Sequence, residues 1–197
     1  MKKTLALFLL IVLLTPACEF GSGAGGGPDV VPDAPDVQAQ EEVKTTREPA
    51  QMEGMTSAHN GYRLQVHDVP LVWDEGLAAY AQEWAEYLRD NHDCQLQHRS
   101  WLGMDELSYG ENLYGASAWG MVLQTTPQQV VDAWYSEIEF YDYDTNGCTD
   151  VWGHYTQVMW KGSTRLGCGV AFCNDGQTDV WVCNYDPPGN WIGMKPW

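Results

Sequence analysis

His154 is the first side chain in this sequence that could do chemistry, because an imidazole can bind a metal ion or exchange a proton near neutral pH. It lies in the segment GHYTQVMW, residues 153–160. With a period of two, this segment predicts a strand. One face of that strand would carry His154, Thr156, Val158 and Trp160. A strand needs no histidine, so the pattern leaves both chemistry and packing open for His154.

Cysteines are the second set of side chains with chemical potential. Besides Cys18, the chain contains Cys94, Cys148, Cys168, Cys173 and Cys183. In an exported protein, cysteines are first interpreted as disulfides. The spacings contain no paired CxxC elements, so a metal site is the second interpretation. Five is an odd number, and one thiol is therefore left over.

The N-terminus predicts export and leaves two modes of processing open. Two lysines, a short apolar run and the small-residue end Thr15-Pro16-Ala17 form the pattern of a signal peptide over residues 1–17. Cys18 directly after Ala17 resembles the bacterial lipobox, which predicts a lipid anchor on this cysteine. Ordinary cleavage after Ala17 is the alternative. We therefore expect an extracytoplasmic protein, either secreted or lipid-anchored at a bacterial cell envelope.

Residues 18–50 differ in composition from the rest of the chain. They are rich in Gly, Pro, Asp, Gln and Glu, and they show no periodic apolar face. Such a segment buries too little apolar surface to offset the entropy of ordering, so we expect a disordered tether. Residues 51–197 hold all ten tryptophans and are long enough for one domain with a substantial core.

The charge of the chain argues against two classes of partner. The formal net charge is −17 at pH 7. An acidic surface repels the phosphates of nucleic acids and the headgroups of anionic lipids. We therefore expect no nucleic-acid partner, and contact with a membrane only through the N-terminal lipid.

Helix signals precede strand signals along the domain. Asp74 is a candidate N-cap for an amphipathic helix, Thr126 begins a capping box, and a shorter helix is expected around 56–66. Strand patterns cover residues 155–160, 167–172 and 180–185. The turn at 174–176 joins the last two as a hairpin. Helices followed by an antiparallel sheet indicate an α+β domain.

Six motifs occur in order between residues 52 and 197. They are HNGYR at 59–63, PLVWDEGLAAYAQEWA at 70–85, GENLY at 110–114, VVDAWYSE at 130–137, GHYTQVMWKGS at 153–163 and CNYDPPGNWIG at 183–193. Together they resemble the CAP superfamily, also called the SCP domain, which is named from cysteine-rich secretory proteins, antigen 5 and plant pathogenesis-related class 1 proteins. The resemblance implies a three-layer α-β-α sandwich with a central antiparallel sheet.

The same resemblance implies a cleft that holds two histidines and two glutamates. Matched motif by motif, these are His98, Glu111, Glu137 and His154. In relatives, the two histidines can bind Zn²⁺ or a similar divalent ion. The carboxylates would complete a four-coordinate site, accept a proton from a metal-bound water, or orient each imidazole. An ionic cluster without metal is a further alternative. Surface or helix-capping positions are expected for the three remaining histidines, His59, His67 and His92.

A catalytic interpretation needs a nucleophile or an activated water. Ser117 matches a serine that has been proposed as part of a triad with the cleft His and Glu in one branch of the family. This match makes Ser117, Glu111 and Glu137 the candidate catalytic residues. The HExxH arrangement of many zinc peptidases does not occur in the sequence. A metal-dependent or serine-type hydrolase is therefore the alternative function.

The function that we expect first is non-enzymatic binding of a lipid, a sterol or another envelope component, with a divalent ion in the cleft. Phe140, Tyr141 and Tyr143 match a loop in which sterol-binding relatives place a lipid-contacting segment. Packing of these aromatic side chains against the end of a helix is the alternative interpretation. The natural ligand and the oligomeric state stay open.

The resemblance also implies two disulfides, Cys94–Cys173 and Cys168–Cys183. Many relatives have a third bridge from the position of Cys148 to a cysteine just before the GHYTQ motif. This sequence has Trp152 in that region. Cys148 is therefore expected to be unpaired, or to pair with Cys18 or with another chain.

Overall fold

The computed structural model describes residues 47–66, 69–99, 109–148 and 153–197 of the chain. Its helices are η1 (Ala50–Met52), α1 (Met55–Arg63), α2 (Glu75–His92), α3 (Pro127–Tyr135), η3 (Ser136–Phe140), α4 (Gly153–Val158) and η4 (Asn174–Gly176). Its strands are β1 (Val72–Trp73), β2 (Gly110–Ser117), β3 (Tyr141–Asp142), β4 (Gly147–Cys148), β5 (Arg165–Cys173) and β6 (Thr178–Asp186). The expected signal peptide, Cys18 and most of the expected tether lie outside these ranges.

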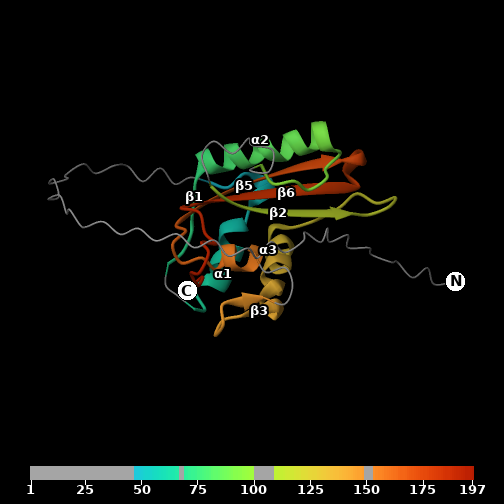
Figure 1. The fold of residues 1–197 in the computed structure, drawn as a ribbon. Helices are drawn as coiled ribbons and strands as arrows, with labels where there is room; N and C mark the ends of the chain where they lie inside the picture. Colours follow the sequence, from blue (N-terminus) through green and yellow to red (C-terminus); the bar gives the residue numbers. More distant parts are fainter. Residues whose placement is uncertain (1–46, 67–68, 100–108, 149–152) are drawn as a thin grey trace, which may run out of the picture.

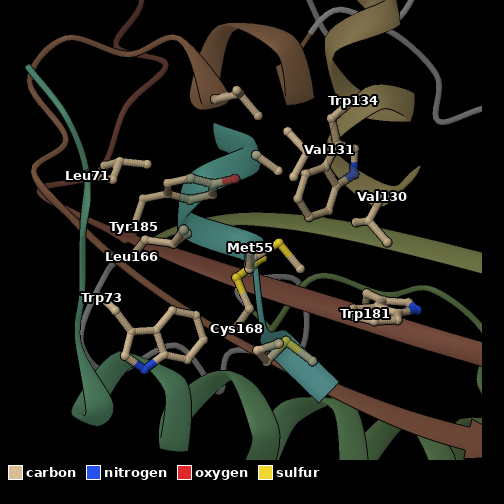
Figure 2. Packing of buried hydrophobic residues seen from close by; sticks show 14 of the residues in the cluster. Met55, Leu71, Trp73, Val130, Val131, Trp134, Leu166, Cys168, Trp181 and Tyr185 are labelled. Carbon is tan, nitrogen blue, oxygen red and sulfur yellow. A yellow bond between two sulfur atoms is a disulfide. The ribbon is translucent and has the colours of Figure 1, made fainter. Parts of the chain in front are cut away.

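A four-stranded sheet lies between helices on both of its faces (Figure 1). The strand order is β1-β5-β6-β2, and β3 and β4 form a separate two-stranded sheet. α2 covers one face across β5 and β6, whereas α1, α3 and α4 pack on the other. Figure 2 shows side chains of α3 and of the sheet, among them Trp134 and Trp181, pointing into one interior. The three-layer α-β-α sandwich is confirmed.

The resemblance implied a central antiparallel sheet, and the observed sheet is mixed because one of its three strand pairs is parallel. β6 runs antiparallel to both β5 and β2, and the turn at 174–176 joins β5 to β6 as predicted. β1, in contrast, pairs parallel with the first two residues of β5. Parallel pairing needs a long connection between the strands, and here α2, β2, α3 and α4 all lie between β1 and β5 in the chain.

The helix start signals in the sequence are confirmed. The side chain of Asp74 accepts a hydrogen bond from the backbone N–H of Leu77 at 2.9 Å, at the start of α2. At the start of α3, the Thr126 hydroxyl accepts from the Gln129 backbone N–H, and Gln129 Oε1 accepts from the Thr126 backbone N–H. Both caps satisfy N–H groups that a helix end leaves without an internal partner.

The contacts of the domain begin a few residues before position 51. Glu48, which lies within the expected tether at 18–50, caps α1 with both carboxylate oxygens. These oxygens accept hydrogen bonds from the backbone N–H groups of Gly54 and Thr56, at 2.7 and 2.6 Å. A carboxylate at a helix N-terminus is also stabilised by the helix dipole.

Residues 153–158 form α4, so the strand that the period-two pattern predicted at 155–160 is wrong. The Glu137 carboxylate accepts hydrogen bonds from the first N–H groups of this helix, those of His154 and Tyr155. All four consecutive residues 155–158 are buried. The alternation rule assumes that one face of a segment meets water, and it fails where no residue is exposed.

A buried arginine connects α1 by hydrogen bonds to the end of α4 and the segment that follows it. Arg63 is 0% exposed. Its five guanidinium N–H groups donate to backbone carbonyls at 2.8 to 3.2 Å. The acceptors are the carbonyls of Val69, Val158, Trp160 and Ser163. Burial lowers the pKa of Arg63 to about 10, so this side chain stays charged at neutral pH.

Both disulfides that the resemblance implied are present. Cys94–Cys173 joins the segment after α2 to the end of β5, and Cys168–Cys183 joins β5 to β6. Cys148 is the last residue of β4, and its side chain lies outside the described part of the structure.

Candidate functional site

His98 and Glu111 form the first of two imidazole–carboxylate pairs. His98 lies in the segment that follows α2, and Glu111 is the second residue of β2. Nδ1 of His98 lies 2.8 Å from Oε1 of Glu111. The backbone N–H of Arg99 donates to the same oxygen at 3.1 Å. The two side chains are 20% and 10% exposed, so the pair is shielded from water but reachable.

His154 and Glu137 form the second pair. Nδ1 of His154 lies 2.6 Å from Oε1 of Glu137. The other oxygen of Glu137 accepts hydrogen bonds from the backbone N–H groups of His154 and Tyr155. The indole ring of Trp134 stacks against the imidazole of His154, with ring planes 15° apart. Glu137 therefore holds both the imidazole and the helix that carries it.

The edge strand β2 connects the two pairs. Consecutive strand residues point to opposite faces, so Glu111 and Asn112 reach different layers of the sandwich. The side-chain amide of Asn112 donates to the backbone carbonyl of His154 at 3.1 Å and to the Tyr185 hydroxyl at 3.2 Å. β2 thus holds His98 through Glu111, and α4 through Asn112. The resemblance implied no role for Asn112, although this residue lies beside Glu111 in the GENLY motif.

His59 is buried, and its expected position at the surface or at a helix end is wrong. Its Nδ1 lies 2.8 Å from the Met55 carbonyl, and its Nε2 lies 2.9 Å from the Tyr185 hydroxyl. A carbonyl can only accept, so Nδ1 carries the proton and Nε2 accepts from Tyr185. Tyr185 also bonds Asn112, which in turn bonds the backbone of His154. His59 therefore belongs to the network that holds α4.

We expect His59 to make the domain sensitive to acid. Burial is the main cause that lowers the pKa of His59 from 6.5 to about 4. Between these two pH values the unfolded chain binds a proton more readily than the folded chain. The stability that neutral His59 contributes is therefore complete above pH 6.5 and is lost as the pH falls toward 4, by roughly 3 kcal/mol.

Urea unfolding at pH 7 and at pH 4.5 measures this loss. Carboxylates elsewhere in the protein also titrate in this range, so the comparison needs the variant His59→Gln. Glutamine has no proton to gain, and the variant should show a smaller difference between the two pH values. An equal difference in the wild-type protein and in the variant would contradict the assignment.

Ser117 does not lie beside either imidazole–carboxylate pair. It is the last residue of β2, six residues from Glu111, which corresponds to about 20 Å along a strand. Its hydroxyl lies 3.1 Å from Oγ1 of Thr178 at the surface. The structure therefore does not assemble the triad that the resemblance suggested. Of the other expected surface histidines, His92 lies in the last turn of α2, and His67 lies outside the described residues.

The three aromatic residues of segment 140–143 differ in their exposure. Tyr141 is buried in the core, and its hydroxyl donates to Asn146 at 2.8 Å. The hydroxyl of Tyr143 donates to the backbone carbonyl of Trp197, and the two rings stack with centroids 5.0 Å apart. Phe140 and Tyr143 are exposed. The burial of Tyr141 agrees with the alternative that this aromatic side chain packs inside the domain.

The positions of the donor atoms fit a metal site with two histidine ligands better than a metal site in which all four side chains are ligands. In each pair the carboxylate contacts Nδ1, so an ion would bind the imidazole through Nε2. Glu137 uses both oxygens within its own pair. In the described ranges, no three side chains of His, Cys, Asp or Glu gather closely enough to hold a metal ion. Among the alternatives, the glutamates therefore fit the orienting role.

No helix in the described part of the chain combines the length and the apolar character needed to cross a bilayer. Both disulfides are formed, as expected for a domain that lies outside the reducing cytoplasm.

Comparisons with known proteins agree on one family. The model of the CAP family, described as the cysteine-rich secretory protein family, matches residues 56–185. Pathogenesis-related protein 1 of Arabidopsis thaliana is 45% identical over 142 residues, which cover 72% of this chain and 79% of that protein. The structure of venom allergen-like protein 4 of Schistosoma mansoni has a TM-score of 0.60 at 21% identity, over 76% of this chain and 95% of that one. The structure of NaASP2 with Zn²⁺ has a TM-score of 0.55 at 21% identity, over 79% and 88% of the two chains.

Proposed function

Because this chain belongs to the cysteine-rich secretory protein family, we propose that its domain is a non-enzymatic binding module in which His98 and His154 hold a divalent metal ion. The observation that carries this proposal is the contact of each Nδ1 with a glutamate. Such a carboxylate fixes the orientation of the ring and raises the basicity of the other nitrogen, which binds the metal. NaASP2, which shares the fold, has a structure with Zn²⁺.

We further propose that the module acts at the cell envelope. The N-terminal sequence suits a signal peptide, a lipid anchor on Cys18 and a tether to the domain. A lipid, a sterol or another envelope component is the class of ligand that a domain in this place would meet. Phe140 and Tyr143 are the residues of the expected ligand loop that such a molecule could contact, since Tyr141 is buried.

Binding is a better-supported function than hydrolysis. A serine mechanism needs Ser117 beside one of the pairs, and Ser117 lies at the other end of β2. A metal-dependent mechanism needs a carboxylate that accepts a proton from a bound water. Both glutamates instead contact the Nδ1 atoms of their histidines, and Glu137 also caps α4. These contacts support an orienting role for the glutamates.

We expect the full-length protein to bind Zn²⁺ and the double variant His98→Ala, His154→Ala to lose this binding. Isothermal titration calorimetry at pH 7.5, in a buffer that does not bind metal, measures the affinity. Glu111→Gln and Glu137→Gln should each bind about 10 to 100 times more weakly, because an amide orients the imidazole less well than a carboxylate.

The matched control for the metal experiment is His92→Ala. His92 lies in the last turn of α2 and belongs to neither pair, so this variant should bind as the wild-type protein does. Circular dichroism shows whether each variant keeps the fold. Wild-type protein that takes up no divalent ion, or a double variant that binds as tightly as the wild type, would refute the metal proposal.

A further inference from the structure

Within the described ranges, the outer edge of β5 is paired with another strand only over its first two residues. Cys168 and Cys183 lie opposite each other with Cα atoms 4.1 Å apart, the short spacing of a pair that exchanges no backbone hydrogen bonds. The N–H and C=O groups of Cys168 therefore point away from β6, as do those of every second residue along β5. Beyond β1, these outward positions are Cys168, Val170 and Phe172.

At Val170, a side-chain amide takes the place of a neighbouring strand. The Gln82 amide donates to the Val170 carbonyl at 3.0 Å, and Oε1 of Gln82 accepts from the Val170 N–H at 2.9 Å. A residue of an adjacent antiparallel strand would make the same two bonds. Gln82 reaches this edge because Gly169 has no Cβ atom, which would collide with the backbone of α2 at Gln82.

A pocket of about 740 Å³ lies along the same edge, between the segment 47–52, β1, α2 and β5. Its apolar lining includes Met52, Trp73, Ala78, Val170 and Phe172. The pocket is accessible at Phe172, which is 45% exposed. Its charged lining residues are Arg47, Glu75, Glu86 and Arg89. Both signs are present in equal number, so the pocket favours neither an anion nor a cation.

We propose that this pocket binds an extended, uncharged peptide segment of a partner protein as an additional strand on the edge of β5. No hydrogen bond from another segment among residues 47–66, 69–99, 109–148 and 153–197 reaches the outward N–H and C=O groups of Cys168 and Phe172. A peptide backbone supplies the donors and acceptors that these groups lack, which an acyl chain does not. The peptide replaces the Gln82 amide at Val170, and its alternate side chains enter the apolar part of the pocket.

A fluorescein-labelled seven-residue peptide of alternating threonine and valine is a suitable probe. Fluorescence anisotropy with the full chain should show saturable binding. The same peptide with every amide N-methylated keeps its side chains but has no N–H donors, and we expect it to bind at least ten times more weakly. Chelation with EDTA should leave peptide binding unchanged, which separates this site from the histidine pairs.

Two variants change the pocket in opposite directions. Gln82→Ala exposes the Val170 groups and should tighten peptide binding about three- to tenfold. Phe172→Asp places a charge at the accessible end and should weaken binding at least tenfold. Gln128→Ala removes a glutamine on α3, which does not line the pocket, and is the control that should bind as the wild type does.

Three results would overturn the proposal. The first is no binding of the peptide to either the wild-type protein or Gln82→Ala. The second is equal binding of the N-methylated peptide, which would mean that the pocket accepts an apolar chain without using the strand edge. The third is unchanged affinity in Phe172→Asp, which would place the peptide elsewhere on the domain.

Discussion

Replacing Arg63 with methionine should lower the free energy of unfolding by about 3 to 5 kcal/mol. Methionine fills much of the volume of the arginine stem but has no donor. The carbonyls of Val69, Val158, Trp160 and Ser163 would lose the guanidinium that they contact. A buried acceptor without a partner costs about 1 to 3 kcal/mol, and water entering the site would recover part of the sum.

Urea unfolding followed by tryptophan fluorescence at pH 7 measures this effect. Arg63→Lys should lie between the wild type and the methionine variant, because an ammonium group keeps the charge but lacks the planar fork that reaches carbonyls on several sides. Arg89→Met is the matched control, because Arg89 is exposed and, in the described part of the chain, forms its ion pair with its neighbour Asp90 at the surface. A loss below 1 kcal/mol in Arg63→Met would show that the guanidinium contributes little.

Removal of the Cys94–Cys173 disulfide is expected to destabilise the domain more than removal of Cys168–Cys183. The bridged residues are 79 positions apart in the first case and 15 in the second. A bridge that closes a longer loop removes more conformational entropy from the unfolded chain. The expected losses are about 4.5 and about 3 kcal/mol.

Paired alanine variants test this order, with both cysteines of one bridge replaced in each protein. Urea unfolding of the two variants and of the wild type supplies the comparison. Cys168 and Cys183 are among the most buried residues, so their replacement also removes sulfur atoms from the core. A larger loss in the Cys168→Ala, Cys183→Ala variant would mean that core packing outweighs loop closure in this domain.

Local sequence signals located the helices α2 and α3 and the hairpin of β5 and β6. The caps at Asp74 and Thr126 and the turn at 174–176 depend on hydrogen bonds between residues three or four positions apart. Such bonds form wherever the residue types and their spacing allow them, so the sequence predicts them well. No local signal of this kind predicted α4. Its N-terminus is capped by Glu137, 17 positions away, and its last four residues, 155–158, are all buried.

The sequence by itself determined the family, the three-layer class of fold, both disulfides and the residues of the two pairs, because the six motifs identify the family and the resemblance implies the rest. Only the tertiary structure decided that each glutamate contacts Nδ1, that His59 is buried and bonded to Tyr185, and that β5 has no strand partner beyond β1 among the described residues. These are contacts between segments that lie far apart in the chain. No local pattern encodes them, since they arise only when the layers pack.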